Sequence, residues 1–178
     1  MKLIKETELY EVYLTEPKDW KKIKEHIMKI ENSAFEEEVR QDEDDIESTF
    51  TDEKSICLIV KDKKSKKIVA YTMSSPLEDY EFLRFDPHYG KYDTLYIEST
   101  AVLPNYQGKG IGKLLKEVLI EEAKRRGYKR ITTRATNEII VHINEKYGFR
   151  KVKYFKEWVG NRDAWYMELK LDNAPGGI

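Results

Sequence analysis

A glycine-rich turn that follows Val102 contains the residues best suited to chemistry. Gly108, Gly110 and Gly112 lie where a strand-like run ends and an amphipathic, helix-like run begins. Glycine lets the backbone adopt positive φ angles and approach a ligand closely. The first N–H groups of a helix have no partner within the helix, and the helix dipole is positive at that end. The turn is therefore predicted to bind phosphate.

Two common nucleotide-binding loops do not fit this turn. A Walker A loop has glycine, four residues and then Gly-Lys-Ser/Thr. Here Gly112-Lys113 is preceded at the required position by Gln107 and followed by Leu114. A dinucleotide fingerprint needs a third glycine where Lys113 stands. A nucleotide-dependent enzyme is thus the weaker interpretation of this turn, and the absence of a thermal shift with ATP would exclude it.

Strands and helices alternate around the turn. Aromatic and β-branched runs predict strands, and apolar residues at three- and four-residue spacing predict helices. Predicted strands are Leu9–Leu14, Ile56–Lys61, Ile68–Met73, Leu95–Val102, Arg130–Ala135, Phe149–Val159 and Ala164–Leu171. One predicted helix starts at Pro17, and a second, short helix ends near Phe50. A third starts at Gly110 and is capped by Gly127, and a fourth spans Asn137–Tyr147. This order predicts an α/β fold, with a mixed sheet and helices on its faces.

Length and composition narrow the class of protein. The chain of 178 residues suits one domain over 1–172, with a short frayed tail from Asn173 to Ile178. With 32 Lys and Arg against 33 Asp and Glu, no nucleic-acid partner is expected. Cys57 lies in an apolar run and is expected to be buried in a strand. Because neither a signal peptide nor a membrane-spanning run is found, we expect a soluble, cytoplasmic protein without a membrane partner.

The turn resembles the pyrophosphate loop of GCN5-related N-acetyltransferases (GNAT), Gln/Arg-x-x-Gly-x-Gly/Ala. Gln107, Gly110 and Gly112 occupy its defined positions. The family's later elements are matched by Thr136-Asn137, Glu145-Lys146-Tyr147-Gly148-Phe149 and Asp163-Ala164-Trp165-Tyr166-Met167, although Ala70 stands where glycine is common. The resemblance runs from about Trp20 to Leu171. It implies an enzyme that transfers the acetyl group of acetyl-CoA to a primary amine.

The resemblance also implies how the co-substrate is held. In this fold a mostly antiparallel mixed sheet splays between two parallel strands, here Leu95–Val102 and Arg130–Ala135. The pantetheine arm pairs with backbone of the first strand, and the diphosphate takes N–H groups of the turn. Lys109 or Lys113 meets the remaining phosphate charge, unless each is only a solvated lysine. The implied cofactor-binding residues are Ala101, Val102, Leu103, Gln107, Gly108, Lys109, Gly110, Ile111, Gly112, Lys113 and Asn137. No metal site is expected.

Aminolysis of a thioester needs a base that deprotonates the acceptor ammonium. Glu98 is the candidate, because a carboxylate within an apolar strand is costly unless it has a use or a partner. Strand alternation predicts that Glu98, Thr100 and Val102 share a face. A backbone N–H near Val102 could polarise the thioester carbonyl. A partnered or partly exposed glutamate on a sheet face is the alternative.

The acid that protonates the departing thiolate is less clear. Many relatives place a tyrosine seven residues beyond the asparagine, where this chain has Asn144. Asn144 is therefore the second candidate catalytic residue, because its amide can donate a hydrogen bond to sulfur. Tyr147 is interpreted as a packing residue. Asn137 can cap its helix, contact the pantetheine arm, or do both.

The acceptor is implied to bind against Phe35–Phe50, Glu78–Tyr92 and Trp158–Trp165. The first segment is acidic and the others are aromatic, which favours a cationic amine with an apolar body. Polyamines, amino-sugars, peptide N-termini and lysines all fit this description. The same residues could instead form a solvated surface and hairpin packing. A non-catalytic acyl-CoA sensor or scaffold is the alternative function, and both a monomer and a homodimer stay open.

Overall fold

The computed structural model describes residues 1–159 and 161–171. Its strands are β1 (Lys2–Glu6), β2 (Tyr10–Leu14), β3 (Ile56–Asp62), β4 (Ile68–Pro76), β5 (Thr94–Val102), β6 (Arg130–Ala135), β7 (Arg150–Val159) and β8 (Arg162–Lys170). Its α-helices are α1 (Trp20–Ala34), α2 (Glu43–Phe50), α3 (Ile111–Arg125) and α4 (Glu138–Lys146). Short 3-10 turns are η1 (Pro17–Asp19), η2 (Glu37–Val39), η3 (Leu77–Asp79), η4 (Glu81–Leu83) and η5 (Pro104–Tyr106).

The strands form a mixed sheet in the order β1-β2-β3-β4-β5-β6-β8-β7. The β5–β6 pair is parallel and joins Thr94, Leu95 and Tyr96 to β6, whereas the other registered pairs are antiparallel. The described chain comprises two compact units, residues 1–75 with 98–122 and residues 76–97 with 123–178. Strand β5 contributes its first half to the second unit and its second half to the first. The predicted α/β class with a mixed sheet is confirmed.

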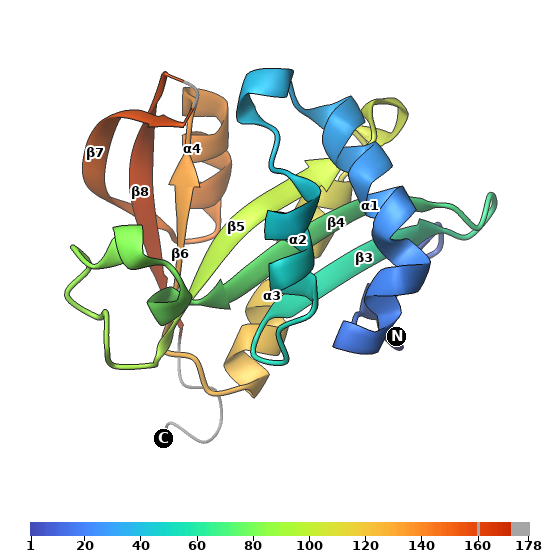
Figure 1. Ribbon diagram of the computed structural model, residues 1–178, viewed down its shortest axis with the longest axis horizontal. Coiled ribbons are helices and arrows are strands. Elements are labelled where there is room, and N and C mark those ends of the chain that lie inside the picture. Colours follow the sequence, from blue (N-terminus) through green and yellow to red (C-terminus); the bar gives the residue numbers. More distant parts are fainter. Residues whose placement is uncertain (160, 172–178) are drawn as a thin grey trace. The chain divides into compact units, whose positions relative to one another are not determined.

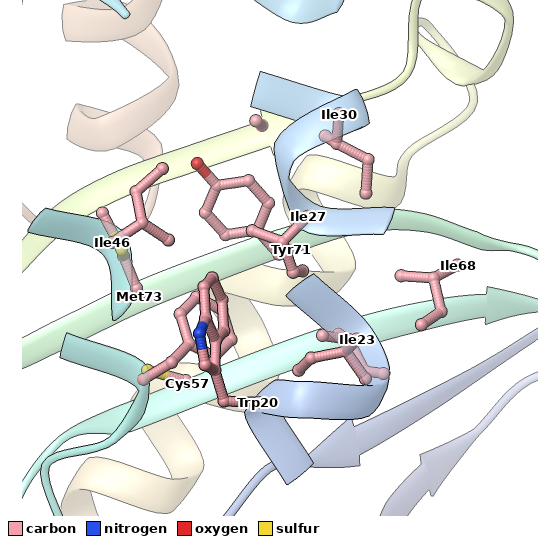
Figure 2. Close-up of a cluster of buried hydrophobic side chains, with 12 residues drawn as sticks. Trp20, Ile23, Ile27, Ile30, Ile46, Cys57, Ile68, Tyr71 and Met73 are labelled. Carbon is pink, nitrogen blue, oxygen red and sulfur yellow. The ribbon is translucent and has the colours of Figure 1, made fainter. Parts of the chain in front are cut away.

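In the first unit, the apolar stripe of α1 forms the core with β3 and β4. The predicted stripe residues Trp20, Ile23, Ile27 and Ile30 are all buried. They lie over Tyr71, Met73 and Cys57, together with residues of α2 (Figure 2). Figure 1 shows α1 and α2 on the near side of β3 and β4 and α3 on the far side. Cys57 is buried in a strand, as predicted.

In the second unit, β6, β8 and β7 are antiparallel neighbours, and α4 packs against them (Figure 1). The end of α4 turns sharply at Gly148, where φ is +96°. A Cβ at this position would meet Leu169 Cδ1 at 3.2 Å, so both the backbone angle and the space favour glycine. The Gly148-Phe149 pair thus ends the helix and buries Phe149 in the core.

Most predicted elements are confirmed to within a few residues. Strand β1 was missed, because Lys2–Glu6 is mostly exposed at a sheet edge and its sequence is charged. Asn137 caps α4, as predicted: its Oδ1 accepts the Ile140 N–H at 2.9 Å. The predicted frayed tail lies outside the described residues. The expectation of a single domain stays a prediction.

None of the helices within 1–159 and 161–171 has the length and apolar composition to cross a bilayer.

The buried stripe of α1 makes a specific stability prediction. Ile27 is fully buried, so Ile27→Ala removes several methyl groups and leaves a cavity. We expect the free energy of unfolding to fall by about 2–5 kcal/mol, measured by urea denaturation. Ile139→Ala is the matched control, since Ile139 is 73% exposed on α4 and should change stability by at most about 0.5 kcal/mol. Equal losses in both variants would contradict this assignment of the core.

Lys116 of α3 is expected to make the free energy of unfolding depend on pH. Burial lowers the pKa of its ammonium to about 8, whereas an unfolded lysine titrates near about 10.4. The folded state therefore holds fewer protons than the unfolded state between these values. The resulting penalty is fully present below about pH 8 and is relieved as the pH rises toward about 10.4.

We therefore expect Lys116→Met to unfold at higher urea concentration than the parent chain at pH 7. This advantage should shrink as the pH rises above 8, where the parent lysine loses its proton. Lys113→Met, at an exposed position of the same helix, should not show this trend. A constant advantage of Lys116→Met from pH 7 to pH 10 would contradict the proposed cause.

Candidate functional site

The start of α3 presents backbone donors without partners. The Gly110 carbonyl accepts the Leu114 N–H at 3.0 Å, so the helical hydrogen bonds begin at Gly110. The N–H groups of Ile111, Gly112 and Lys113 precede that first bond, and the described part of the chain supplies no acceptor for them. At a helix N-terminus such groups, together with the dipole, favour an anion. This geometry supports the predicted phosphate site.

The turn before α3 is also open. Gly108 and Gly110 have φ angles of +76° and +82°, which side chains rarely adopt. No described atom lies within 4 Å of a Cβ built at Gly108, Gly110 or Gly112. Residues 107–110 are exposed. The described residues thus leave the turn exposed, as the predicted binding of a diphosphate would require.

The preceding residues fix the shape of this turn. Gln107 Nε2 donates to the Val102 carbonyl at 3.0 Å, and the Gln107 N–H donates to the Pro104 carbonyl at 3.2 Å. Gln107, the first residue of the motif, therefore stabilises the turn through hydrogen bonds to nearby backbone. Whether the side chain or N–H of Gln107 also contacts the co-substrate stays a prediction.

The two candidate lysines differ in their surroundings. Lys109 Nζ lies 5.4 Å from the centre of the Tyr106 ring. The Tyr106 hydroxyl donates to Asp62 Oδ2 at 2.6 Å, and this hydrogen bond lowers the pKa of the Asp62 carboxyl. Lys113 is exposed on the first turn of α3. Both ammonium groups are near the turn in sequence, and their contact with phosphate stays a prediction.

The end of β5 has one free backbone edge. The Leu103 N–H donates to the Val69 carbonyl of β4 at 2.9 Å. Because successive N–H groups of a strand point to opposite edges, the Val102 N–H points away from β4. Val102 is half-buried, whereas Ala101 is buried in the core of the first unit. This arrangement suits the predicted pairing of a ligand amide or carbonyl with backbone at Val102.

Glu98 is held by a hydrogen bond from α2. Thr49 Oγ1 donates to Glu98 Oε2 at 2.9 Å, while Thr49 itself is buried. Glu98 is half-buried. The Thr49 hydroxyl thus helps to orient the carboxylate, and the residue stays partly accessible, as a general base requires.

The predicted alternation along β5 is wrong at this point. Thr100 Oγ1 lies 2.7 Å from Thr72 Oγ1 of β4. The next residue on β4, Tyr71, belongs to the core under α1 and α2, so Thr72 and Thr100 lie on the opposite face of the sheet. The Glu98 carboxylate instead reaches Thr49 of α2, on the core side, so Glu98 and Thr100 do not share a face. Such a departure from alternation is the effect that a β-bulge produces.

A fully buried carboxylate of the first unit, Glu31, was missed from the sequence. Glu31 is fully buried in α1, where it accepts the Tyr71 hydroxyl and, at 3.3 Å, the Gln41 N–H. Burial, together with this carboxylate, raises the pKa of Tyr71 above its ordinary value. A signal was present, because Glu31 stands four residues after Ile27 and therefore on the buried face. Through Gln41 it ties the segment between α1 and α2 to the core.

Asn144 has a packing environment in the second unit. Its side chain is buried, and its Nδ2 donates to Met167 Sδ at 3.7 Å. Its carbonyl accepts the N–H groups of Tyr147 and Phe149 at the end of α4. These contacts are those of a residue that fixes a helix end, and a catalytic role for Asn144 stays a prediction.

The predicted acceptor segments show two kinds of surroundings. In the first unit, Glu43, Asp44 and Asp45 of α2 are exposed, and Asp42 caps the helix by accepting the Asp45 N–H. In the second unit, the aromatic residues of the loop before β5 pack against those of β7 and β8. Part of the aromatic content is therefore hairpin packing, which was the stated alternative. No group of His, Cys, Asp or Glu within 1–159 and 161–171 is arranged to hold a metal ion.

Comparisons with known proteins support this fold and show the family. The family model of the acetyltransferase (GNAT) family matches residues 20–149. The ribosomal-protein-S18-alanine N-acetyltransferase from Escherichia coli superposes with a TM-score of 0.74 and 20% identity, covering 96% of this chain and 99% of that one. Arabidopsis thaliana NAA60 in complex with acetyl-CoA gives 0.68 and 13%, covering 91% and 98%. No curated protein sequence matches this chain.

Gly112 offers a test of the turn. A Cβ at Gly112 meets no described protein atom, and its φ is not positive, so Gly112→Ala should fold normally. The added methyl group would stand where the diphosphate approaches the helix amides. We expect the Kd for CoA, measured by calorimetry, to rise about tenfold or more, about 1.4 kcal/mol.

Gly127→Asn, at the other end of α3, is the matched control. Its φ of +86° is one that asparagine tolerates, so CoA affinity should not change. If Gly112→Ala bound CoA as tightly as the parent chain, the diphosphate would not lie against the α3 amides.

Proposed function

The chain belongs to the acetyltransferase (GNAT) family and uses acetyl-CoA, and on this premise we propose that the acetyl group passes to a primary amine by direct attack within a ternary complex. The observation that carries the proposal is the open start of α3. Three helix amides without partners follow two glycines in positive φ, next to the end of β5. A diphosphate gripped there would bring the thioester end of the same molecule to β5.

Acetyl-CoA supplies an activated acetyl carbonyl and a thiolate leaving group. The residues of this chain have the task of binding it and of handling protons around it. The amides of Ile111, Gly112 and Lys113 would hold the diphosphate. The Val102 N–H, which points away from β4, would donate a hydrogen bond to the carbonyl oxygen. This bond would stabilise the negative charge that develops there.

Glu98 is proposed as the general base. An amine at neutral pH is mostly an ammonium with a pKa of about 10.4, and it cannot attack until a proton leaves. Glu98 would take that proton, directly or through one water, while Thr49 keeps the carboxylate in place. The freed electron pair of the nitrogen then forms the new C–N bond at the acetyl carbonyl.

Collapse of the tetrahedral intermediate completes the transfer. The C–S bond breaks, the thiolate leaves, and the amide nitrogen loses its second proton. A thiol has a pKa of about 8.5, so the thiolate can take a proton from water at neutral pH. The mechanism therefore does not require Asn144 as a proton donor.

The acceptor class is supported by the charge of the first unit. The exposed carboxylates of Glu43, Asp44 and Asp45 lie on α2, the helix whose Thr49 holds Glu98. They would attract an ammonium group to the strand that carries the base. A cationic acceptor is thus proposed on electrostatic grounds, with acetyl-CoA-binding without turnover as the competing outcome.

Glu98→Gln tests the proposed base, because it keeps the shape and the Thr49 contact but cannot accept a proton at neutral pH. We expect kcat/KM for a responsive amine to fall about 100-fold or more, with thiol release as the readout. CoA affinity should stay within about twofold. The experiment starts from a screen of primary amines with the parent chain.

Two variants make this result specific. Glu25→Gln removes an exposed carboxylate from α1, outside the predicted acceptor segments, and should leave the rate unchanged. Thr49→Val removes the hydrogen bond but keeps the base, so a loss smaller than that of Glu98→Gln is expected. Turnover by Glu98→Gln within threefold of the parent would remove Glu98 from the mechanism, and CoA binding without any turnover would favour the sensor.

A further inference from the structure

The second unit contains an aromatic cavity that the mechanism above does not use. Its volume is about 400 Å³, within the range of small-molecule pockets, about 300–1,000 Å³. Phe82, Phe85, Phe155 and Trp158 line it, and Arg134 of β6 adds a guanidinium. Phe82 is 56% exposed despite its size, so an apolar surface remains uncovered at the mouth of the cavity.

The aromatic walls are fixed by contacts within the same unit. Trp158 stacks on Tyr166, with ring centres 6.1 Å apart and planes 12° apart, and packs edge-on against Phe155 at 4.7 Å. Phe85 packs edge-on against Tyr166 at 4.9 Å. The Tyr166 hydroxyl donates to buried Asp86 at 2.6 Å. The cavity is thus formed by a packed cluster rather than by loose side chains.

An irregularity in β7 places Trp158 in this cluster. Glu157 has a φ of +55°, which is rare for a residue with a side chain, and the β7–β8 register shifts between Phe155 and Val159. Asp163 fixes the irregularity by accepting the Glu157 N–H at 3.1 Å and the Tyr154 hydroxyl at 2.5 Å. The Tyr154 hydrogen bond also lowers the pKa of the Asp163 carboxyl. Strained backbone of this kind is frequent at ligand sites.

Arg134 lies on the same face as the aromatic cluster. It stands directly opposite Tyr166 in the β6–β8 register, and opposed residues of an antiparallel pair share a face. Arg134 is half-buried, and within 1–159 and 161–171 no carboxylate or carbonyl is found as its partner. A guanidinium in this position favours a carboxylate, which it can bind through two parallel hydrogen bonds.

The charges around the cavity disfavour a cationic group inside it. Lys153 Nζ already lies 5.3 Å from the Phe85 ring centre and 5.0 Å from the Phe155 ring centre, where a cation would sit. The lining residues Arg134 and Lys156 carry two positive charges against one negative charge of Glu157. An apolar group with a neighbouring carboxylate is the complementary ligand.

We propose that this cavity binds a bulky apolar side chain, aromatic or branched aliphatic, whose neighbouring carboxylate pairs with Arg134. The ligand is thus a small carboxylic acid that carries a bulky apolar group. Its binding site lies within the second unit and does not depend on the proposed function.

The binding test needs neither acetyl-CoA nor transfer. Trp158 lines the cavity, so its fluorescence can follow titration with 3-phenylpropionate, 3-phenylpropanamide and 3-phenylpropylamine. We expect the carboxylate to bind at least tenfold more tightly than the amide or the amine. Trp158→Phe should remove the signal, since Trp20 is buried in the first unit and Trp165 faces the other side of the strands.

Variants assign the preference to Arg134. Arg134→Gln should reduce the tenfold preference to twofold or less, and Phe82→Ala, at an exposed ring, should weaken all three ligands. Lys151→Gln is the matched control, because Lys151 lies over Trp165, 4.9 Å from its ring centre, on the opposite face. Equal binding of carboxylate and amide, or a preference that survives Arg134→Gln, would overturn the proposal.

Discussion

The N–H groups at the start of α3 are the constraint on which the functional interpretation depends. A helix cannot satisfy its own first amides, so these donors need a capping side chain, water or a ligand. Here glycines at 108, 110 and 112 leave the turn without side chains, and no described residue covers it. The open donors favour an anion, and the family match identifies acetyl-CoA as the molecule that brings a diphosphate.

The first unit contains both this turn and the carboxylate of Glu98, which is held in place by the packing of α2. The apolar stripe of α1 and the short helix α2 cover β3 and β4, and this packing brings Thr49 to Glu98. Glu31 of α1 is fully buried, and its carboxylate accepts hydrogen bonds from the Tyr71 hydroxyl and the Gln41 N–H. Burying such a group is favourable only when it is hydrogen-bonded, and its bonds hold the segment that leads into α2. Glu98, the proposed base, and the residues that support it are therefore built on one core.

The second unit is built around a cluster of aromatic residues, some of which line a cavity. Several rings pack around Tyr166, whose hydroxyl is satisfied by Asp86, and this leaves a cavity rather than a filled core. The positive φ of Glu157, fixed by Asp163, turns Trp158 into the cluster. Arg134 lies on this face without a partner in the described chain, and with Lys156 and Glu157 it adds charged groups to an otherwise aromatic lining. Such a combination recognises ligands that carry both kinds of group.

The sequence by itself determined the elements and the phosphate turn. Periodicity identified the buried face of α1, glycine spacing identified the turn, and Asn137 was correctly expected to cap α4. These features depend on residues close together along the chain, so local physics specifies them. The family resemblance, carried by the same short motifs, was confirmed by the match over residues 20–149.

Only the tertiary structure decided which side chains meet. Alternation placed Glu98 with Thr100, but a local irregularity in β5 turns the carboxylate to Thr49, 49 residues away in sequence. Neither the contact of Glu31 with Tyr71 nor the shared face of Arg134 and Tyr166 follows from neighbouring residues. Contacts of this kind depend on register, on bulges and on the packing of distant segments. A sequence pattern specifies its own element, whereas the surroundings of that element are set by the folded chain.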